Sequence, residues 1–193
     1  MSNHAEQVTR LLRAIEGGKA RAADELLPLV YEELRSRAGV LLAGERRDHT
    51  LQRTALVHEA YLCLLGPGAN FKSRLHFFNA AALAMRRILV NHALQHRTLK
   101  RGGDRARVDL EQLDVAEPAS GEPMDWSLLD DALKKLEAES PRQHQVVMLR
   151  FFSGRTEAEI AQMLEVSEST VRRDWATARV WLCWAMEQQP ERE

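Results

Sequence analysis

The sequence is poor in cysteine and has no long apolar run. Only two of its 193 residues are cysteines, Cys63 and Cys183, and they lie too far apart for a metal-binding spacing. Both are expected to be reduced thiols of a cytosolic protein. No apolar stretch approaches the roughly 18 residues that a membrane helix needs, and the N-terminus lacks the apolar core of a signal peptide. The sequence therefore predicts a cytoplasmic protein without membrane insertion.

Strong net charge, strand patterning and catalytic motifs are also missing. The 27 Lys and Arg residues nearly balance the 28 Asp and Glu residues, so any case for nucleic-acid binding has to be local. Apolar and polar residues nowhere alternate over a sustained stretch, which predicts an all-α fold. There is no nucleophile elbow and no Walker glycine loop, and the His92–His96 pair has no third ligand nearby. We therefore expect no enzyme activity, no cofactor and no metal site.

Residues 156–182 have the pattern of two short helices around a tight turn. Thr156 and Glu159 have the spacing of a capping box, and Ser167 is a second N-cap candidate shortly afterwards. The second helix then carries apolar residues at i, i+4, i+7 and i+11, which is the stripe of an amphipathic helix. This pattern predicts a helix-turn-helix, although Glu165 occupies the turn, where glycine is easier on the backbone.

The polar face of the second helix suggests what it binds. Ser169 and Arg173 point away from the apolar stripe, Arg172 and Thr177 flank them, and Asp174 projects off this arc. A recognition helix presents its N-terminal residues to base edges, and arginine can pair bidentately with guanine. The alternative is an ordinary helical hairpin whose solvated face carries arginines.

A second informative stretch runs from residue 85 to 101 and contains no acidic residue. A basic run on a helix indicates phosphate contact, because cations that neutralise phosphates supply most nucleic-acid affinity. A solvated basic face is the alternative reading of this run. Its bases are Arg86, Arg87, Arg97, Lys100 and Arg101, and His92 and His96 add donors.

The first hundred residues are predicted to form four helical stretches. The first contains residues 8–15 and stops at Gly17-Gly18, and the second covers 20–42, where Pro28 either kinks or divides it. Thr54 is the expected N-cap of a helix over 55–65, and a long helix follows from 73 or 74 to about 96.

The chain changes character between residues 102 and 122, which are rich in glycine and acidic side chains. This composition predicts a flexible acidic linker. After it, one helix begins near Trp126, and Ser140-Pro141 marks the start of the next. We therefore predict two small helical domains, 1–101 and 124–193, joined by a linker at 102–123, with the second domain ending in the helix-turn-helix.

Taken together, these features resemble the sigma-70 family of bacterial transcription initiation factors, in its short extracytoplasmic-function (ECF) type. The resemblance covers nearly the whole chain. Besides the helix-turn-helix, the stretches that carry it are LVHEAYLCLL (56–65), HFFNAAALAMRRILVNHALQHRTLKRGG (76–103) and SPRQHQVVMLRFFSG (140–154).

The resemblance implies partners and site residues. Core RNA polymerase is the expected partner, through its β′ clamp helices and its β flap, together with promoter DNA; an anti-sigma factor or another regulator is a further candidate. The stretch 56–65 is implied to dock on the clamp helices, and the basic helix to recognise and help melt the minus-ten element. The polymerase contacts implied are Leu56, His58, Glu59 and Leu62, and the minus-ten contacts are Arg86, Arg87, Asn91 and His92.

The resemblance assigns the minus-thirty-five element to the helix-turn-helix. Arg155, just before the capped helix, is implied to grip a phosphate. The residues implied to read bases and phosphates are Ser169, Thr170, Arg172, Arg173 and Thr177.

Two questions stay open from sequence. A free-standing helix-turn-helix repressor or a response-regulator output domain is the main alternative function, and a need for core polymerase distinguishes it. The acidic linker, or the acidic helix after it (Asp130, Asp131, Glu137), either covers the basic surface of the first domain or acts as a plain tether. A flexible linker of this length spans roughly 25 Å, so such contact is geometrically easy.

Overall fold

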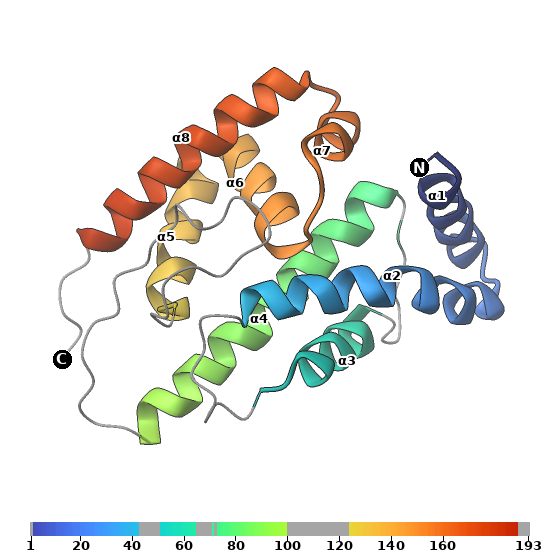
Figure 1. Ribbon diagram of the computed structural model, residues 1–193, viewed down its shortest axis with the longest axis horizontal. Helices are drawn as coiled ribbons and strands as arrows, with labels where there is room; N and C mark the ends of the chain where they lie inside the picture. Colours follow the sequence, from blue (N-terminus) through green and yellow to red (C-terminus); the bar gives the residue numbers. More distant parts are fainter. Residues whose placement is uncertain (1, 43–50, 65–70, 72, 100–123, 189–193) are drawn as a thin grey trace.

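A computed structural model describes residues 2–42, 51–64, 71, 73–99 and 124–188, and within these ranges the fold is all-α, as predicted. No strand occurs in the described part of the chain. The helices are α1 (Ser2–Glu16), α2 (Ala20–Leu41), α3 (Arg53–Leu64), α4 (Arg74–Leu99), α5 (Trp126–Glu139), α6 (Pro141–Val147), the π-helical turn η2 (Met148–Phe152), α7 (Glu157–Leu164) and α8 (Glu168–Glu187) (Figure 1).

The first two helices pack against each other as a hairpin. Val8, Leu11 and Leu12 of α1 are buried, as their helical spacing predicts. The chain turns at Gly18, which has a φ of +77°, a conformation that glycine adopts without steric cost. Helix α2 is continuous through Pro28, so this proline does not divide it.

Helix α3 begins at Arg53, one residue before the predicted N-cap. Thr54 therefore lies inside the first turn, and its expected role as the N-cap is wrong. The buried positions of α3 are Leu56, Val57, Ala60 and Leu64, which all face the core.

Helix α4 is the central element of the molecule. It contacts α1 and α3 on one side and α5, η2 and α7 on the other, and Figure 1 shows it (green) between these two groups. The Ser73 hydroxyl accepts a hydrogen bond from the amide of His76 at 3.1 Å, which caps the helix start. Its buried side chains include Phe77, Phe78 and Met85.

Helices α5 and α6 and the turn η2 form the layer that meets α4. The Asp125 carboxylate caps α5 by accepting from the amides of Ser127 and Leu128. Ser140 is the N-cap residue of α6 and Pro141 its first residue, as predicted, although the Ser140 side chain makes no capping hydrogen bond. In η2 the amide of Ser153 bonds the carbonyl five residues earlier, at 3.2 Å, which produces the wide turn.

One buried apolar cluster runs through both helix groups, from Val8 in α1 to Met186 in α8. No described helix is long and apolar enough to cross a membrane. The predicted linker at 102–123 lies outside the described residues.

Candidate nucleic-acid interface

The start of α7 has both bonds of a capping box. The Thr156 hydroxyl accepts from the amide of Glu159 at 3.3 Å, and the Glu159 carboxylate accepts from the amide of Thr156 at 3.0 Å. These bonds satisfy two donors that would otherwise lack a partner at a helix start. The predicted capping box is therefore confirmed.

A three-residue turn joins α7 to α8. Glu165 has a φ of +55° and is the only described non-glycine residue in the left-handed region. The Ala161 carbonyl accepts from the amides of Glu165 and Val166, which ends α7. The Ser167 hydroxyl then accepts from the amide of Thr170 at 3.1 Å and starts α8.

One face of α8 is buried, and a charged residue lies on it. Val171, Trp175 and Leu182 are buried, as the apolar stripe predicted. Asp174 is buried with them, where it accepts hydrogen bonds from Arg142 at 2.6 and 3.2 Å. This bidentate pair ties α6 to α8 and places Asp174 off the polar face, in agreement with the sequence analysis.

The opposite face of α8 is open to solvent near its N-terminus. Ser169, Arg173 and Thr177 are exposed, one turn apart along the helix. Arg173 forms no ion pair with any described residue. Ser169 bonds the Ser167 hydroxyl at 2.8 Å, and Thr170 is half-buried beside it.

Arg172 is exposed but held by a carboxylate of α7. Its Nε and Nη2 atoms donate to Glu157 at 3.2 and 3.0 Å, while Arg150 donates to the other oxygen at 2.7 Å. The bond from Arg150, joined by that from Arg172, holds the pKa of Glu157 below its usual value despite partial burial. Arg150 also lies 4.8 Å from the centroid of the Trp175 ring. Glu157 therefore fixes the angle between α7 and the front of α8.

On α4 the predicted contact residues divide into exposed and inward-facing positions. Arg87 and Asn91 are exposed, and His92 is half-buried. Arg97 lies within α4, but its side chain is outside the described set, as are Lys100 and Arg101 altogether.

Arg86 faces the C-terminal helices and is buried. It donates to the Asp130 carboxylate at 2.8 Å and to the Asp130 carbonyl at 3.2 Å, and it lies 3.5 Å from His144. Burial by itself would raise the pKa of Asp130, but hydrogen bonds from Lys134 and Arg86 outweigh it and lower the pKa. Arg86 is therefore not available to DNA in this arrangement, although the resemblance implies a minus-ten contact for it.

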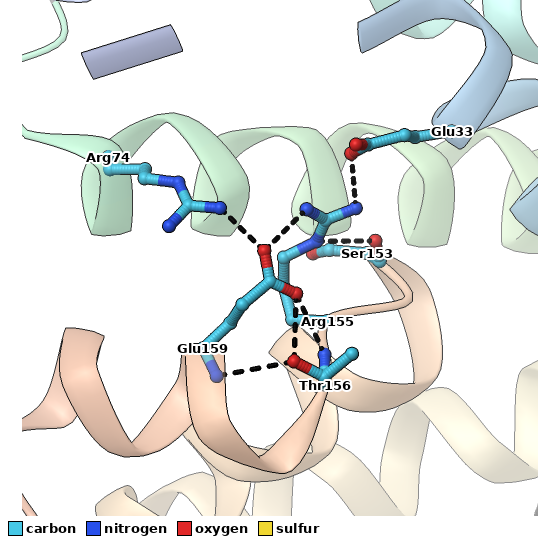
Figure 2. Close-up of polar contacts among 6 residues, drawn as sticks. All are labelled: Glu33, Arg74, Ser153, Arg155, Thr156 and Glu159. Carbon is cyan, nitrogen blue, oxygen red and sulfur yellow. Dashed lines mark hydrogen bonds and ion pairs between the residues drawn. The ribbon is translucent and has the colours of Figure 1, made fainter. Parts of the chain in front are cut away.

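Arg155 is also buried, in the cluster of Figure 2. Its Nη2 donates to Glu33 of α2 at 2.6 Å and its Nη1 to Glu159 at 3.2 Å, and Arg74 donates to the same Glu159 oxygen at 2.5 Å. The guanidinium also stacks over Phe78, 4.2 Å from the ring centroid. Arg155 is therefore not available to a phosphate in this arrangement, because its guanidinium already donates to the carboxylates of Glu33 and Glu159.

The predicted polymerase-contact residues lie on two sides of α3. His58, Glu59 and Leu62 are exposed, and the Leu62 side chain is 59% exposed. Leu56 is wholly buried in the core, so its assignment as a direct contact is corrected: it can only support the exposed face from beneath.

Sequence reasoning missed the partners of the buried arginines. Glu33 lies 122 positions from Arg155, and no local pattern connects residues so far apart. The sequence indicates only a capping role for Glu159, whereas in the structure its carboxylate also accepts from Arg74 and Arg155. Among the described residues, no group of three or more His, Cys, Asp or Glu side chains is arranged to hold a metal ion.

Comparison with known proteins gives one match. A family model described as "ECF sigma factor" matches residues 5–188. Searches of curated proteins and of solved structures find no significant match. The family match spans both helix groups and the segment between them. It agrees with the all-α architecture, the capped α7–α8 pair and the basic helix α4. The chain belongs to the ECF sigma factor family.

Proposed function

We propose that this transcription initiation factor directs RNA polymerase to promoters by three surfaces of its own: the exposed side of α3, the outer face of α4 and the N-terminal half of α8. The observation that supports this most directly is the family match over residues 5–188, combined with the exposed polar face of α8. Each surface has a different proposed partner.

The front of α8 is assigned to the upstream promoter element. Ser169, Arg173 and Thr177 share one exposed face, and Arg173 has no competing carboxylate among the described residues. A guanidinium free in this way can pair bidentately with a guanine in the major groove. Arg172 is assigned to a phosphate, which it can reach only by leaving Glu157.

The outer face of α4 is assigned to the downstream element and to strand opening. Arg87 and Asn91 are exposed one turn apart, and Leu83 and Leu94 lie on the same side with 49% and 46% exposure. A surface that combines charge with apolar side chains suits a single strand, whose phosphates need cations and whose unpaired bases need apolar contact. The basic residues that follow, Arg97, Lys100 and Arg101, extend this assignment along the chain.

The exposed side of α3 is assigned to the polymerase. His58, Glu59 and Leu62 form a small surface of one acid, one imidazole and one apolar side chain above a buried layer. An apolar side chain with polar neighbours fits the apolar centre and polar rim of a protein–protein contact. The β flap and a regulator such as an anti-sigma factor are further proposed partners, without assigned residues.

The experiment is reconstitution with core polymerase. We expect the chain to bind core polymerase in gel filtration and to transcribe from its own promoter only in that complex. Glu59→Arg should weaken the complex, while the charge reversal Glu6→Arg on the exposed side of α1 should not. Specific promoter binding by the chain alone, as a dimer on a palindrome, would favour the free-standing repressor instead.

A further inference from the structure

Two large apolar side chains on the outside of α8 are not used by the proposed function. Val180 is 69% exposed and Trp184 is 55% exposed, and they lie one turn apart on the side of α8 that faces away from α5 and α6 (Figure 1). The Trp184 ring lies 6.5 Å from that of Trp181, which is half-buried. Contiguous exposed apolar surface, unlike a single exposed side chain, marks an interaction site.

These two residues belong to a regular line of exposed side chains, which we call the outer seam of α8. Its members recur at alternating intervals of four and three residues and are Arg173, Thr177, Val180, Trp184 and Glu187. An average spacing of about 3.5 residues is the period with which two helices pack side by side, at a crossing angle of about 20°. The buried side chains of α8 lie on its opposite face, so the seam is free to meet a second helix.

The seam is symmetric about Val180, and this symmetry identifies the partner. Trp184 lies four residues after Val180, and the small Ala176 lies four residues before it. Glu187 and Arg173 lie seven residues after and before it. When two antiparallel copies of α8 meet at Val180, the large Trp184 of each copy is therefore level with the small Ala176 of the other. By the same symmetry, Arg173 of each copy is level with Glu187 of the other.

The charges at the two ends of the seam favour this antiparallel pairing over a parallel one. Neither Arg173 nor Glu187 forms an ion pair with a described residue of its own chain. An antiparallel pair brings each arginine to a glutamate, whereas a parallel pair would bring arginine to arginine and glutamate to glutamate. Charge complementarity of this kind sets orientation and register, so the surface fits a second copy of this chain.

We propose that two copies of the free chain pair through the outer seam of α8, antiparallel and centred on Val180. Because the seam is one face of one helix, the pair buries less than the roughly 1,200–2,000 Å² of a standard interface, and the expected dissociation constant is on the order of 10–100 μM. A contact of this strength forms where the free chain is concentrated and gives way to a tighter partner.

The pairing has a consequence for DNA binding. Arg173 and Thr177 lie within the seam and are also assigned to the upstream promoter element. A second α8 and a DNA duplex cannot both lie against these side chains, so the paired chain does not read that element and the separated chain does. This consequence rests on the proposed function, whereas the pairing itself does not.

Sedimentation of the full chain without DNA tests the pairing. The average mass should rise from that of one chain, 22.0 kDa, toward twice that value between about 1 and about 300 μM. Val180→Arg places two like charges at the centre of the seam and should weaken association by at least about 10-fold. Val40→Arg, at an exposed valine of α2, is the matched control and should associate like wild type. A wild-type chain that stays monomeric, or a Val180→Arg chain that pairs like wild type, would overturn the proposal.

Charge reversals test the orientation in the same assay. Arg173→Glu or Glu187→Arg alone puts like charges opposite each other in an antiparallel pair and should weaken association about 3- to 10-fold. The double substitution Arg173→Glu, Glu187→Arg reverses both ends and should restore association to the level of wild type. Failure of the double variant to recover would overturn the antiparallel register.

A disulfide at the centre of the seam tests the consequence for DNA. Helix axes about 8–10 Å apart leave about 4–5 Å between facing Cα atoms, which a disulfide spans. In a chain carrying Cys63→Ser and Cys183→Ser, Val180→Cys should form a linked dimer under a mild oxidant much faster than Val40→Cys.

Transcription with core polymerase is the measurement on this linked dimer. The linked dimer should be inactive, and reduction of the disulfide should restore transcription. A linked dimer that is as active as the reduced chain would overturn the masking of Arg173, while the pairing seen by sedimentation would stand. Failure of the wild-type chain to direct transcription would instead count against the proposed function.

Discussion

At the scale of single residues, the arginines of this chain differ in what their guanidinium groups contact. Arg87 and Arg173 are exposed, Arg172 is exposed but shared with Glu157, and Arg86 and Arg155 are buried in ion pairs. An exposed arginine without a partner can form a new bidentate contact at little cost, whereas a paired one must first give up its carboxylate. The proposed DNA contacts therefore divide into arginines that are exposed and arginines that must first leave a carboxylate.

The substitution Arg173→Ala tests one of the exposed arginines. Transcription should fall through the upstream element, since one lost bidentate contact costs roughly 1–3 kcal/mol of discrimination. A scan of base substitutions should show relaxed preference at one or two neighbouring positions, while Arg21→Ala on α2 leaves the scan unchanged. Equal weakening on all sequences would reassign Arg173 to a phosphate.

His144 should make stability depend on pH in a range where carboxylates do not titrate. Burial lowers its pKa, with Arg86 adding to the shift and Glu137 opposing it. The unfolded chain therefore takes up a proton near pH 6.5 while the folded chain does not, so the free energy of unfolding falls as pH drops from about 6.5 to the lowered pKa. Urea unfolding between pH 7.5 and 5 measures this loss.

Two histidine variants test whether His144 causes this pH dependence. His144→Gln should remove the loss in this pH range, whereas His58→Gln, at an exposed position of α3, should retain it. The lowered pKa values of Asp130, Glu157 and Glu159 act separately: their contribution is present above about pH 4 and is lost below it. A pH slope that persists in His144→Gln would assign the effect to another group.

At the scale of helices, local chemistry determined most starts and stops. Gly17-Gly18, the Thr156–Glu159 box and Ser167 could all be read from sequence, because each cap depends on residues within four positions. The start of α3 could not, since several side chains near Thr54 compete for the same role. The π-helical turn η2 has no sequence signal of its own and depends on how Phe151 and Phe152 pack.

The turn between α7 and α8 carries a testable strain. Glu165 adopts a left-handed conformation, which costs a side-chain residue roughly 1–2 kcal/mol relative to glycine. After the greater flexibility of glycine in the unfolded chain is subtracted, Glu165→Gly should raise the free energy of unfolding by about 0.5–1 kcal/mol. Chemical denaturation followed by tryptophan fluorescence measures the change.

A glycine inside the neighbouring helix is the matched control for this turn. Gln162 is exposed in α7, and Gln162→Gly should lower the free energy of unfolding by about 0.5–1 kcal/mol. If both substitutions destabilise to the same extent, the strain assigned to Glu165 is absent in solution.

At the scale of the whole molecule, the sequence divides the chain at an acidic segment, but the folded core does not follow that division. One apolar cluster includes side chains from α1 through α8, and α4 contacts helices of both groups. Composition revealed the segment at 102–123, because glycine and acidic residues are frequent there. Packing between the groups depends on contacts such as Arg155–Glu33, which no periodicity encodes.

The distribution of aromatic residues allows the coupling between the two groups to be measured. All four tryptophans (Trp126, Trp175, Trp181 and Trp184) lie in α5 and α8, so tryptophan fluorescence reports only on the C-terminal helices. Far-UV circular dichroism reports on both groups together. If the ion pairs between the groups (Arg155–Glu33, Arg74–Glu159 and Arg86–Asp130) couple them, a substitution in α3 should change the fluorescence transition as well.

Leu56→Ala is that substitution. Leu56 is fully buried, so its truncation should cost about 2–5 kcal/mol, and at low salt both the dichroism and the fluorescence transitions in urea should shift to lower concentration. In about 1 M NaCl, where the Debye length falls to about 3 Å, the ion pairs between the two groups weaken. The fluorescence transition of Leu56→Ala should then approach that of wild type in the same salt, while the dichroism transition stays shifted. Transitions that coincide at every salt concentration would mean that the shared apolar cluster alone holds the groups together. Transitions that are independent even at low salt would mean that neither the ion pairs nor the apolar cluster couples the unfolding of the two groups.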